Sequence, residues 1–152
     1  MVKSPPKLLA ISSGGGHWVE MLRLRPAFAR FQVTYLTVSN DYAADVPGER
    51  FRSISDATRW NKVKLMLVAG QIIWRLLYER PDVVISTGAA PGYFALRFAK
   101  LMGARTIWLD SIANVEELSM AGQMAGRYAE LWLTQWPHLA REGGPEYFGA
   151  VI

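Results

Sequence analysis

The segment KLLAISSGGGH, from Lys7 to His17, passes directly from a short apolar run into three consecutive glycines. A brief run of Leu, Ala and Ile bounded by a turn is typical of a buried parallel strand, and we expect one over residues 7–13. Beyond the glycines, apolar side chains recur at helical spacing from His17 to Arg30. A strand, a glycine turn and a helix in this order predict the start of a βαβ unit.

The same alternation of strand and helix patterns continues along the chain. A helix stopped by Pro81 is expected at 60–80, and another ends at Met102. Such alternation predicts a Rossmann-like α/β fold, in which helices cover both faces of a mainly parallel sheet. The 152 residues are enough for one core, and we expect a single domain over residues 1–152. The further strands are expected at 32–38, 50–54, 82–86, 105–109 and 130–134.

The composition argues against several kinds of site. The chain has no cysteine, which excludes a disulfide scaffold, an iron–sulfur cluster and a thiol nucleophile. Its two histidines, His17 and His138, are far apart in the sequence, so we expect no metal site and no resident cofactor. We expect His138 to be structural.

The charge is unevenly distributed. Residues 1–80 hold 12 Lys and Arg against 6 Asp and Glu, a balance of +6, whereas residues 81–152 hold 5 against 7, a balance of −2. This asymmetry indicates a basic face that meets nucleic acid, phospholipid or a phosphorylated substrate. Because the sequence has no long run of like charges and no nucleic-acid-binding motif, we expect no nucleic acid partner.

The turn from Ser12 to His17 is the first candidate site. Glycines let backbone N–H groups approach an anion, and the helix that follows adds partial positive charge, so the turn suits phosphate. It matches neither the dinucleotide fingerprint, which requires Gly where Val19 stands, nor a P-loop. The alternative is a tight turn without a ligand. His17 is a candidate general base or phosphate contact, or it caps the helix or bonds a neighbouring loop.

Two further loops follow expected strands, Ser86–Gly92 and Asp110–Asn114. In an open α/β sheet, ligands bind beyond the carboxyl ends of the strands, so we expect these loops and the glycine turn to converge on one crevice. Gly88 permits a close turn, and Pro91 suits the first helical position because it lacks an N–H group. Asp110 would either orient a sugar hydroxyl or the imidazole at the glycine turn, or cap the turn that follows.

Helix 60–80 is apolar on nearly every side, with a thin polar stripe of Lys64, Gln71 and Arg75. Such a helix is either deeply buried or faces lipid or a partner. Its uncharged part, Leu65–Trp74, is shorter than the roughly 18 apolar residues of a membrane span, and we expect no secretory signal peptide. We therefore favour a helix that lies on an anionic membrane. The expected anchors are Arg59, Trp60, Lys62, Trp74 and Arg75.

Taken in order, these motifs resemble the Alg14 family, including its bacterial relatives in exopolysaccharide and capsule assembly. The resemblance is carried by SSGGGH at the first turn, by PD leading to STGAAPG, and by WLDSIANVEELSMAG and QWP. It extends from about Lys7 to Ile152, and its most specific parts are Asp110–Gly122 and Gln135–Pro137.

The resemblance implies the N-terminal, acceptor-side half of a GT-B glycosyltransferase, similar to that half of the MurG-type enzymes. It implies a heterodimer with an Alg13-like catalytic subunit, which binds most of the UDP-sugar. The pair would transfer the sugar, with inversion, to a polyprenyl-diphosphate-linked glycan. This chain would be inactive alone, would hold the acceptor, and would recruit its partner to the cytoplasmic face of the plasma membrane as a peripheral protein.

Carried across to this sequence, the resemblance makes His17 the candidate base or the contact to the acceptor diphosphate. We expect no N-terminal membrane anchor of the eukaryotic kind, and Ala113 stands in place of a Cys and Asp110 in place of a Glu. These departures favour bacterial surface polysaccharide biosynthesis. The alternative is a stand-alone nucleotide-binding or scaffolding Rossmann module without transferase activity. The candidate acceptor- and diphosphate-binding residues are Ser13, Gly14, Gly15, Gly16, Gly88, Ala89, Pro91, Gly92, Asp110, Ser111 and Asn114.

Overall fold

The computed structural model describes residues 3–58 and 60–152, in which seven parallel strands form one sheet. The strands are β1 (Lys7–Ile11), β2 (Gln32–Thr37), β3 (Arg50–Ser53), β4 (Val83–Ser86), β5 (Arg105–Leu109), β6 (Leu131–Thr134) and β7 (Glu146–Tyr147). Their order is β3-β2-β1-β4-β5-β6-β7. Side chains alternate between the faces, so that Leu9 and Ile11 enter one core and Leu8 and Ala10 the other.

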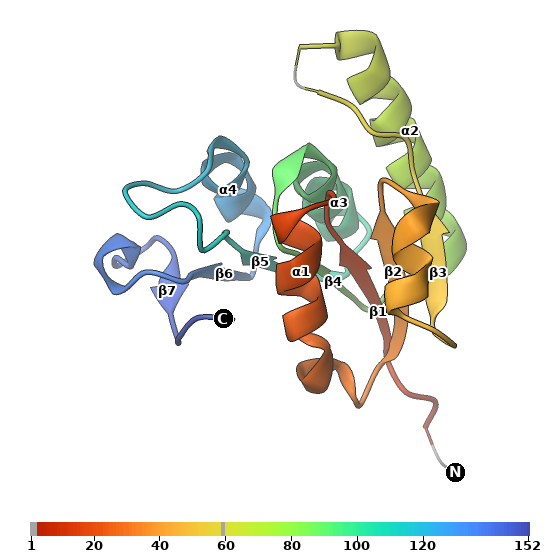
Figure 1. Ribbon diagram of the computed structural model, residues 1–152, viewed down its shortest axis with the longest axis horizontal. Helices are drawn as coiled ribbons and strands as arrows, with labels where there is room; N and C mark the ends of the chain where they lie inside the picture. Colours follow the sequence, from red (N-terminus) through yellow and green to blue (C-terminus); the bar gives the residue numbers. More distant parts are fainter. Residues whose placement is uncertain (1–2, 59) are drawn as a thin grey trace.

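Four α-helices and four 3₁₀ segments accompany the sheet in the described part of the chain (Figure 1). They are α1 (Gly16–Arg23), α2 (Lys62–Glu79), α3 (Ala89–Leu101), α4 (Met120–Ala125), η1 (Arg25–Phe28), η2 (Asn40–Asp45), η3 (Gly126–Tyr128) and η4 (Pro137–Leu139). α1 and η1 pack into the core that contains Trp18. α2, α3 and α4 pack into the opposite core, which contains Trp108. The predicted Rossmann-like α/β fold is confirmed.

Some elements differ from those expected. The expected helix from His17 to Arg30 is wrong in length, because α1 ends at Arg23 and η1 follows. Pro26 has no N–H group to donate to the carbonyl of Leu22, so the α-helical hydrogen-bond pattern cannot continue through it. The six-residue α4 and the two-residue β7 were not expected, since elements this short show little hydrophobic periodicity.

Part of the basic excess of the first 80 residues is paired with acidic side chains. A nitrogen of Arg50 lies 3.1 Å from a Glu79 carboxylate oxygen, and one of Arg52 lies 3.8 Å from the other oxygen. Arg25 lies 3.9 Å from the carboxylate of Glu49. Several of the cations are therefore offset by acidic neighbours.

The centre of the sheet contains a topological switch point. β1 and β4 are adjacent, with Ile11 opposite Ser86 in the register, yet the helices that follow them cover opposite faces. The turns that leave their carboxyl ends therefore lead to opposite faces, and in open α/β sheets such a switch point is the position of the ligand-binding crevice.

Candidate functional site

His17 joins the two turns that open this crevice. Its Nδ1 lies 3.0 Å from the backbone oxygen of Thr87, and the Thr87 hydroxyl donates back to the His17 backbone oxygen at 2.6 Å. A carbonyl oxygen only accepts, so Nδ1 carries the hydrogen and the neutral imidazole has its lone pair on Nε2. The side chain is 30% exposed, and no described residue hydrogen-bonds to Nε2. This nitrogen can accept a proton from a bound molecule.

The glycine turn is shaped by Tyr42 as well as by its own residues. Gly15 has φ +65°, which favours glycine, and its N–H donates to the Tyr42 hydroxyl at 2.9 Å. A Cβ at Gly14 would lie 2.6 Å from that hydroxyl. α1 begins after Gly15 without a capping side chain, so the N–H groups of Gly16 and His17 are the ones that an anion can reach.

Gly88 makes room for the imidazole. Its φ is +144°, and a Cβ there would lie 2.4 Å from Nδ1 of His17. The next residue, Ala89, has φ +67°, a left-handed conformation that costs a residue with a side chain about 1–2 kcal/mol. Backbone strain of this kind occurs where the surrounding structure requires a fixed shape. The second turn is therefore built around His17.

We expect Gly88→Ala to displace the His17 ring and to lower the free energy of unfolding by about 1–3 kcal/mol, because the new Cβ is both strained and in collision with the imidazole. Denaturant unfolding and the NMR signals of the His17 ring measure the two effects. Gly70→Ala is the matched control, since Gly70 lies in α2 with open space around it, and alanine there is expected to stabilise by up to about 1 kcal/mol. Wild-type stability and unchanged His17 signals in Gly88→Ala would contradict this account.

The rest of the second turn serves packing. We expected Pro91 at the first position of a helix. α3 instead begins at Ala89, so Pro91 is its third residue. The missing N–H remains harmless there, because the first four N–H groups of a helix have no partner within it. Gly92 is pressed against β4, since a Cβ would lie 1.9 Å from the Ser86 hydroxyl. Pro91 and Gly92 are both buried and position the turn.

Asp110 closes the third loop. Its buried carboxylate accepts hydrogen bonds from the indole N–H of Trp108 at 3.1 Å and the amide of Asn114 at 3.1 Å. It also accepts from the backbone N–H of Ser119 at 2.9 Å and from the Ser119 hydroxyl at 2.5 Å. Both oxygens are thus occupied by the loop itself. Of the roles expected for Asp110, the geometry supports that of capping the turn that follows. None of the hydrogen bonds given above for its carboxylate involves His17.

A buried carboxylate that the sequence reasoning missed, Glu20, connects the third loop to His17. Its Oε1 accepts from the backbone N–H of Ile112 at 2.7 Å, the Ser111 hydroxyl at 3.3 Å and the Gln135 amide at 2.9 Å. Its Oε2 lies 3.9 Å from Nδ1 of His17. The three loops therefore converge as expected, through a side chain on α1. The sequence did contain a signal for this contact. His17 and Glu20 are three residues apart in a predicted helix, and residues at this spacing lie on the same side of it.

The predicted acceptor-site residues fall into two groups. Ser13, Gly14, Gly15, Gly16 and Ala89 are exposed or half-buried, as is the predicted catalytic residue His17. Residues that are buried, or bonded within their own loop, are Gly88, Pro91, Gly92, Asp110, Ser111 and Asn114. The first group is the surface that a ligand can touch, and the second group fixes its shape.

The predicted membrane-association residues lie apart from the crevice, on α2 or just before it. Arg59 lies outside the described residues. Trp60 and Trp74 are 80% and 56% exposed, Lys62 is exposed, and the guanidinium of Arg75 lies 4.8 Å from the centre of a Trp74 ring. In the described chain, no helix has the length and apolar character needed to cross a membrane.

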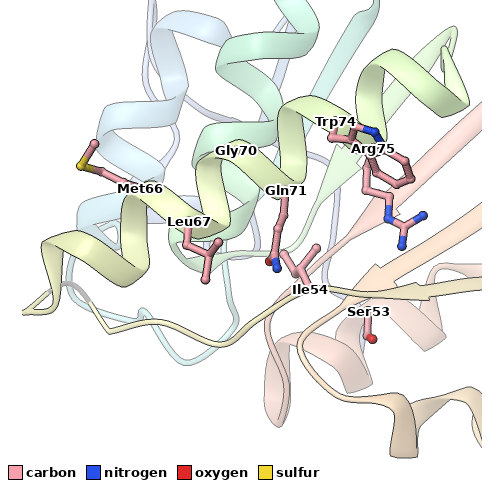
Figure 2. Close-up of a pocket in the computed structure, with 8 residues that line it drawn as sticks. All are labelled: Ser53, Ile54, Met66, Leu67, Gly70, Gln71, Trp74 and Arg75. Carbon is pink, nitrogen blue, oxygen red and sulfur yellow. The ribbon is translucent and has the colours of Figure 1, made fainter.

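α2 packs on one side only. Val68, Ile72 and Leu76 enter the core, whereas the exposed large apolar side chains of the helix are Val63, Met66, Leu67, Ile73, Trp74, Leu77 and Tyr78. A groove of about 470 Å³ runs along α2, and Figure 2 shows its walls. The residues that line it are Ser53, Ile54, Met66, Leu67, Gly70, Gln71, Trp74 and Arg75.

The parallel sheet and its switch point define the class of fold, a Rossmann-like domain. The crystal structure of MurG from Acinetobacter baumannii is similar, with a TM-score of 0.76 and 15% sequence identity. The match covers 97% of this chain and 46% of MurG. The chain therefore spans about half the length of that protein.

Residues 44–151 match the family described as "Oligosaccharide biosynthesis protein Alg14 like". The chain belongs to this family, which confirms the resemblance seen in the sequence. One relative is the UDP-N-acetylglucosamine transferase subunit ALG14 of Yarrowia lipolytica, 26% identical over 98% of this chain and 82% of the relative. Another is the protein of the same name from Eremothecium gossypii, 28% identical over 99% of this chain and 82% of the relative.

Proposed function

We propose that this chain is the acceptor-binding, membrane-recruiting subunit of a two-chain, inverting glycosyltransferase. Its partner is an Alg13-like catalytic subunit that binds most of the UDP-sugar. The pair transfers the sugar to a polyprenyl-diphosphate-linked glycan in surface polysaccharide biosynthesis, at the cytoplasmic face of the plasma membrane. Residues 1–152 act as a single acceptor-binding domain that needs no metal or resident cofactor.

The observation that carries the proposal is that the chain matches most of the length of relatives named as transferase subunits. The chain matches 46% of MurG, whereas it matches 82% of relatives that are named as transferase subunits. A GT-B enzyme has two Rossmann-like halves. Because those relatives are named as subunits, their names support a partner chain that supplies the other half.

The crevice offers the chemistry of an acceptor half. An inverting transfer needs a base for the acceptor hydroxyl, and the accessible Nε2 of His17 suits this role. The acceptor also carries a diphosphate. The free N–H groups of Gly16 and His17 at the start of α1 suit its negative charge. α3 begins at Ala89 in the neighbouring turn, so a second helix N-terminus lies near the first.

The exposed side of α2 supports the proposed recruitment to a membrane. Its apolar side chains lie beside the exposed cations Lys62 and Lys64. A helix that combines an apolar face with nearby cations is attracted to an anionic bilayer. The polyprenyl part of the proposed acceptor is itself embedded in the bilayer, so a subunit that holds this acceptor works at the membrane surface.

The two-chain proposal is tested by purifying this chain alone and in complex with an Alg13-like partner. Each preparation is given UDP-sugars and polyprenyl-diphosphate glycans, and the lipid-linked products are followed by mass spectrometry. We expect product from the complex and none above the enzyme-free background from the isolated chain, because one half of a GT-B site cannot hold both substrates.

Turnover by the isolated chain at the rate of the complex would contradict the two-chain proposal. Adding free UDP to the isolated chain distinguishes the two-chain transferase from the alternative, a stand-alone nucleotide-binding module. Thermal stabilisation by UDP, with no transfer by the complex, would favour a nucleotide-binding module without transferase activity.

A further inference from the structure

Glu20 has a buried carboxylate oxygen that the acceptor chemistry described above does not use. The side chain is 3% exposed. Oε1 accepts the hydrogen bonds from Ile112, Ser111 and Gln135, whereas Oε2 is buried and has no hydrogen-bond partner among the described residues. An unpartnered buried oxygen is destabilising. Anchoring of the third loop accounts for Oε1 and leaves the position of Oε2 unexplained.

Oε2 faces the imidazole of His17 from one helical turn away, at 3.9 Å from Nδ1. This separation is too long for a hydrogen bond, and the Nδ1 hydrogen is directed to the Thr87 backbone oxygen instead. A carboxylate at this distance interacts strongly with an imidazole only when the ring is positively charged. The geometry therefore suits a charge that appears during the reaction.

Other titratable groups around the crevice are engaged elsewhere. The Tyr42 hydroxyl accepts the N–H of Gly15, and the carboxylate of Asp110 is bonded within its own loop. Within the described residues, Glu20 is the one carboxylate within 4.0 Å of a His17 ring nitrogen.

We infer that Glu20 is a positioning residue that stabilises protonated His17 during transfer, an inference that rests on the proposed function. In the reaction, the acceptor O–H bond breaks and its proton moves to Nε2 of His17. The acceptor oxygen forms the glycosidic bond to the anomeric carbon, and the bond from that carbon to UDP breaks, with its electron pair leaving on UDP. The imidazole becomes positively charged in this step, and the neighbouring carboxylate stabilises it.

Glu20→Gln isolates the charge from the anchoring role. Glutamine keeps an oxygen for the three donors at Oε1 and changes only the oxygen that has no partner. NMR titration of the isolated chain reads the effect on His17, and His138→Gln assigns the signals because the chain has two histidines. We expect the midpoint of the His17 titration at lower pH in Glu20→Gln than in the wild type, since the uncharged side chain favours the imidazolium less.

Glu79→Gln is the matched control. Glu79 is a second buried glutamate with an oxygen that has no hydrogen-bond partner among the described residues, and it lies on α2 in ion pairs with Arg50 and Arg52. The same substitution there is expected to leave the His17 midpoint unchanged. If Glu20→Gln does not fold, Gln135→Leu removes one donor from Oε1 and leaves the charge. The inference then predicts a midpoint at higher pH, whereas a purely structural role predicts no change.

In the complex, we expect Glu20→Gln to lower kcat about tenfold or more and to leave KM for the acceptor unchanged, because the interaction is made only as charge develops. An unchanged midpoint, or an unchanged kcat in an active complex, overturns the inference. A shifted midpoint in the isolated chain, together with no transfer by the wild-type complex, contradicts the proposed function and leaves the Glu20–His17 coupling intact. The two failures are therefore distinguishable.

Discussion

Replacing His17 with alanine is expected to lower kcat of the two-chain complex by about 10²–10⁴-fold, the usual contribution of a positioned general base. Alanine removes Nε2 but keeps the backbone N–H of residue 17 at the start of α1. Contacts from that N–H to the acceptor diphosphate would remain, so KM for the acceptor should change little. Initial rates across acceptor concentrations measure both constants, and size-exclusion chromatography shows whether the two chains still associate.

His138→Ala is the control for this substitution. The His138 ring is bonded through Nε2 to the backbone oxygen of Val115, and we expect the variant to keep the wild-type rate. Unchanged rates in the His17 variant would remove His17 from the base role. A rise in KM with kcat preserved would instead assign His17 to contact with the acceptor diphosphate, another role that the sequence left open.

The fold could be predicted because its signals are local. β5 spans the residues expected, Arg105–Leu109, and β2 differs by a single residue from its predicted range. Each buried parallel strand appears in the sequence as a short apolar run. The end of α1 was harder to predict, because the apolar pattern continues beyond Pro26 although this proline interrupts the helix. β7 has two residues, too few to show any alternation.

The candidate site was predictable in part, and for the same reason. Glycine turns after strands are visible in the sequence, and the topology places two of them at the switch point. Glu20 was missed because its partners Ile112 and Gln135 are 92 and 115 residues away. Asp110 directly follows a strand, yet the hydrogen-bond partners of its carboxylate lie within nine residues of it. Position after a strand does not reveal whether a carboxylate serves its own loop or a distant one.

The structure shows which residues of the basic excess have acidic neighbours and which are exposed. Arg25, Arg50 and Arg52 have acidic neighbours in the structure, so they contribute little to an anion-binding face. Lys62 and Lys64 are exposed at the start of α2, next to exposed Val63. These two lysines are therefore the cations of α2 through which the proposed membrane binding can be tested.

Reversal of both charges, in Lys62→Glu/Lys64→Glu, is expected to weaken binding to anionic vesicles by about 10³-fold. Each cation near such a surface contributes about 1 kcal/mol. Reversing two cations therefore costs about 4 kcal/mol, since attraction is lost and repulsion of similar size replaces it, and this is about three powers of ten in affinity. Flotation with phosphatidylglycerol vesicles, compared with neutral vesicles, measures the loss.

Arg97→Glu/Lys100→Glu provides the matched control, because it makes the same change in net charge, from +4 to 0, on the exposed side of α3. If α2 lies on the membrane, the control binds almost as well as the wild type, since the Debye length of about 8 Å screens charges held away from the surface. Equal loss in both variants would mean that vesicles respond to net charge alone. Undiminished flotation of the α2 variant would reject its cations as anchors and leave the exposed apolar side of the helix free for a protein partner.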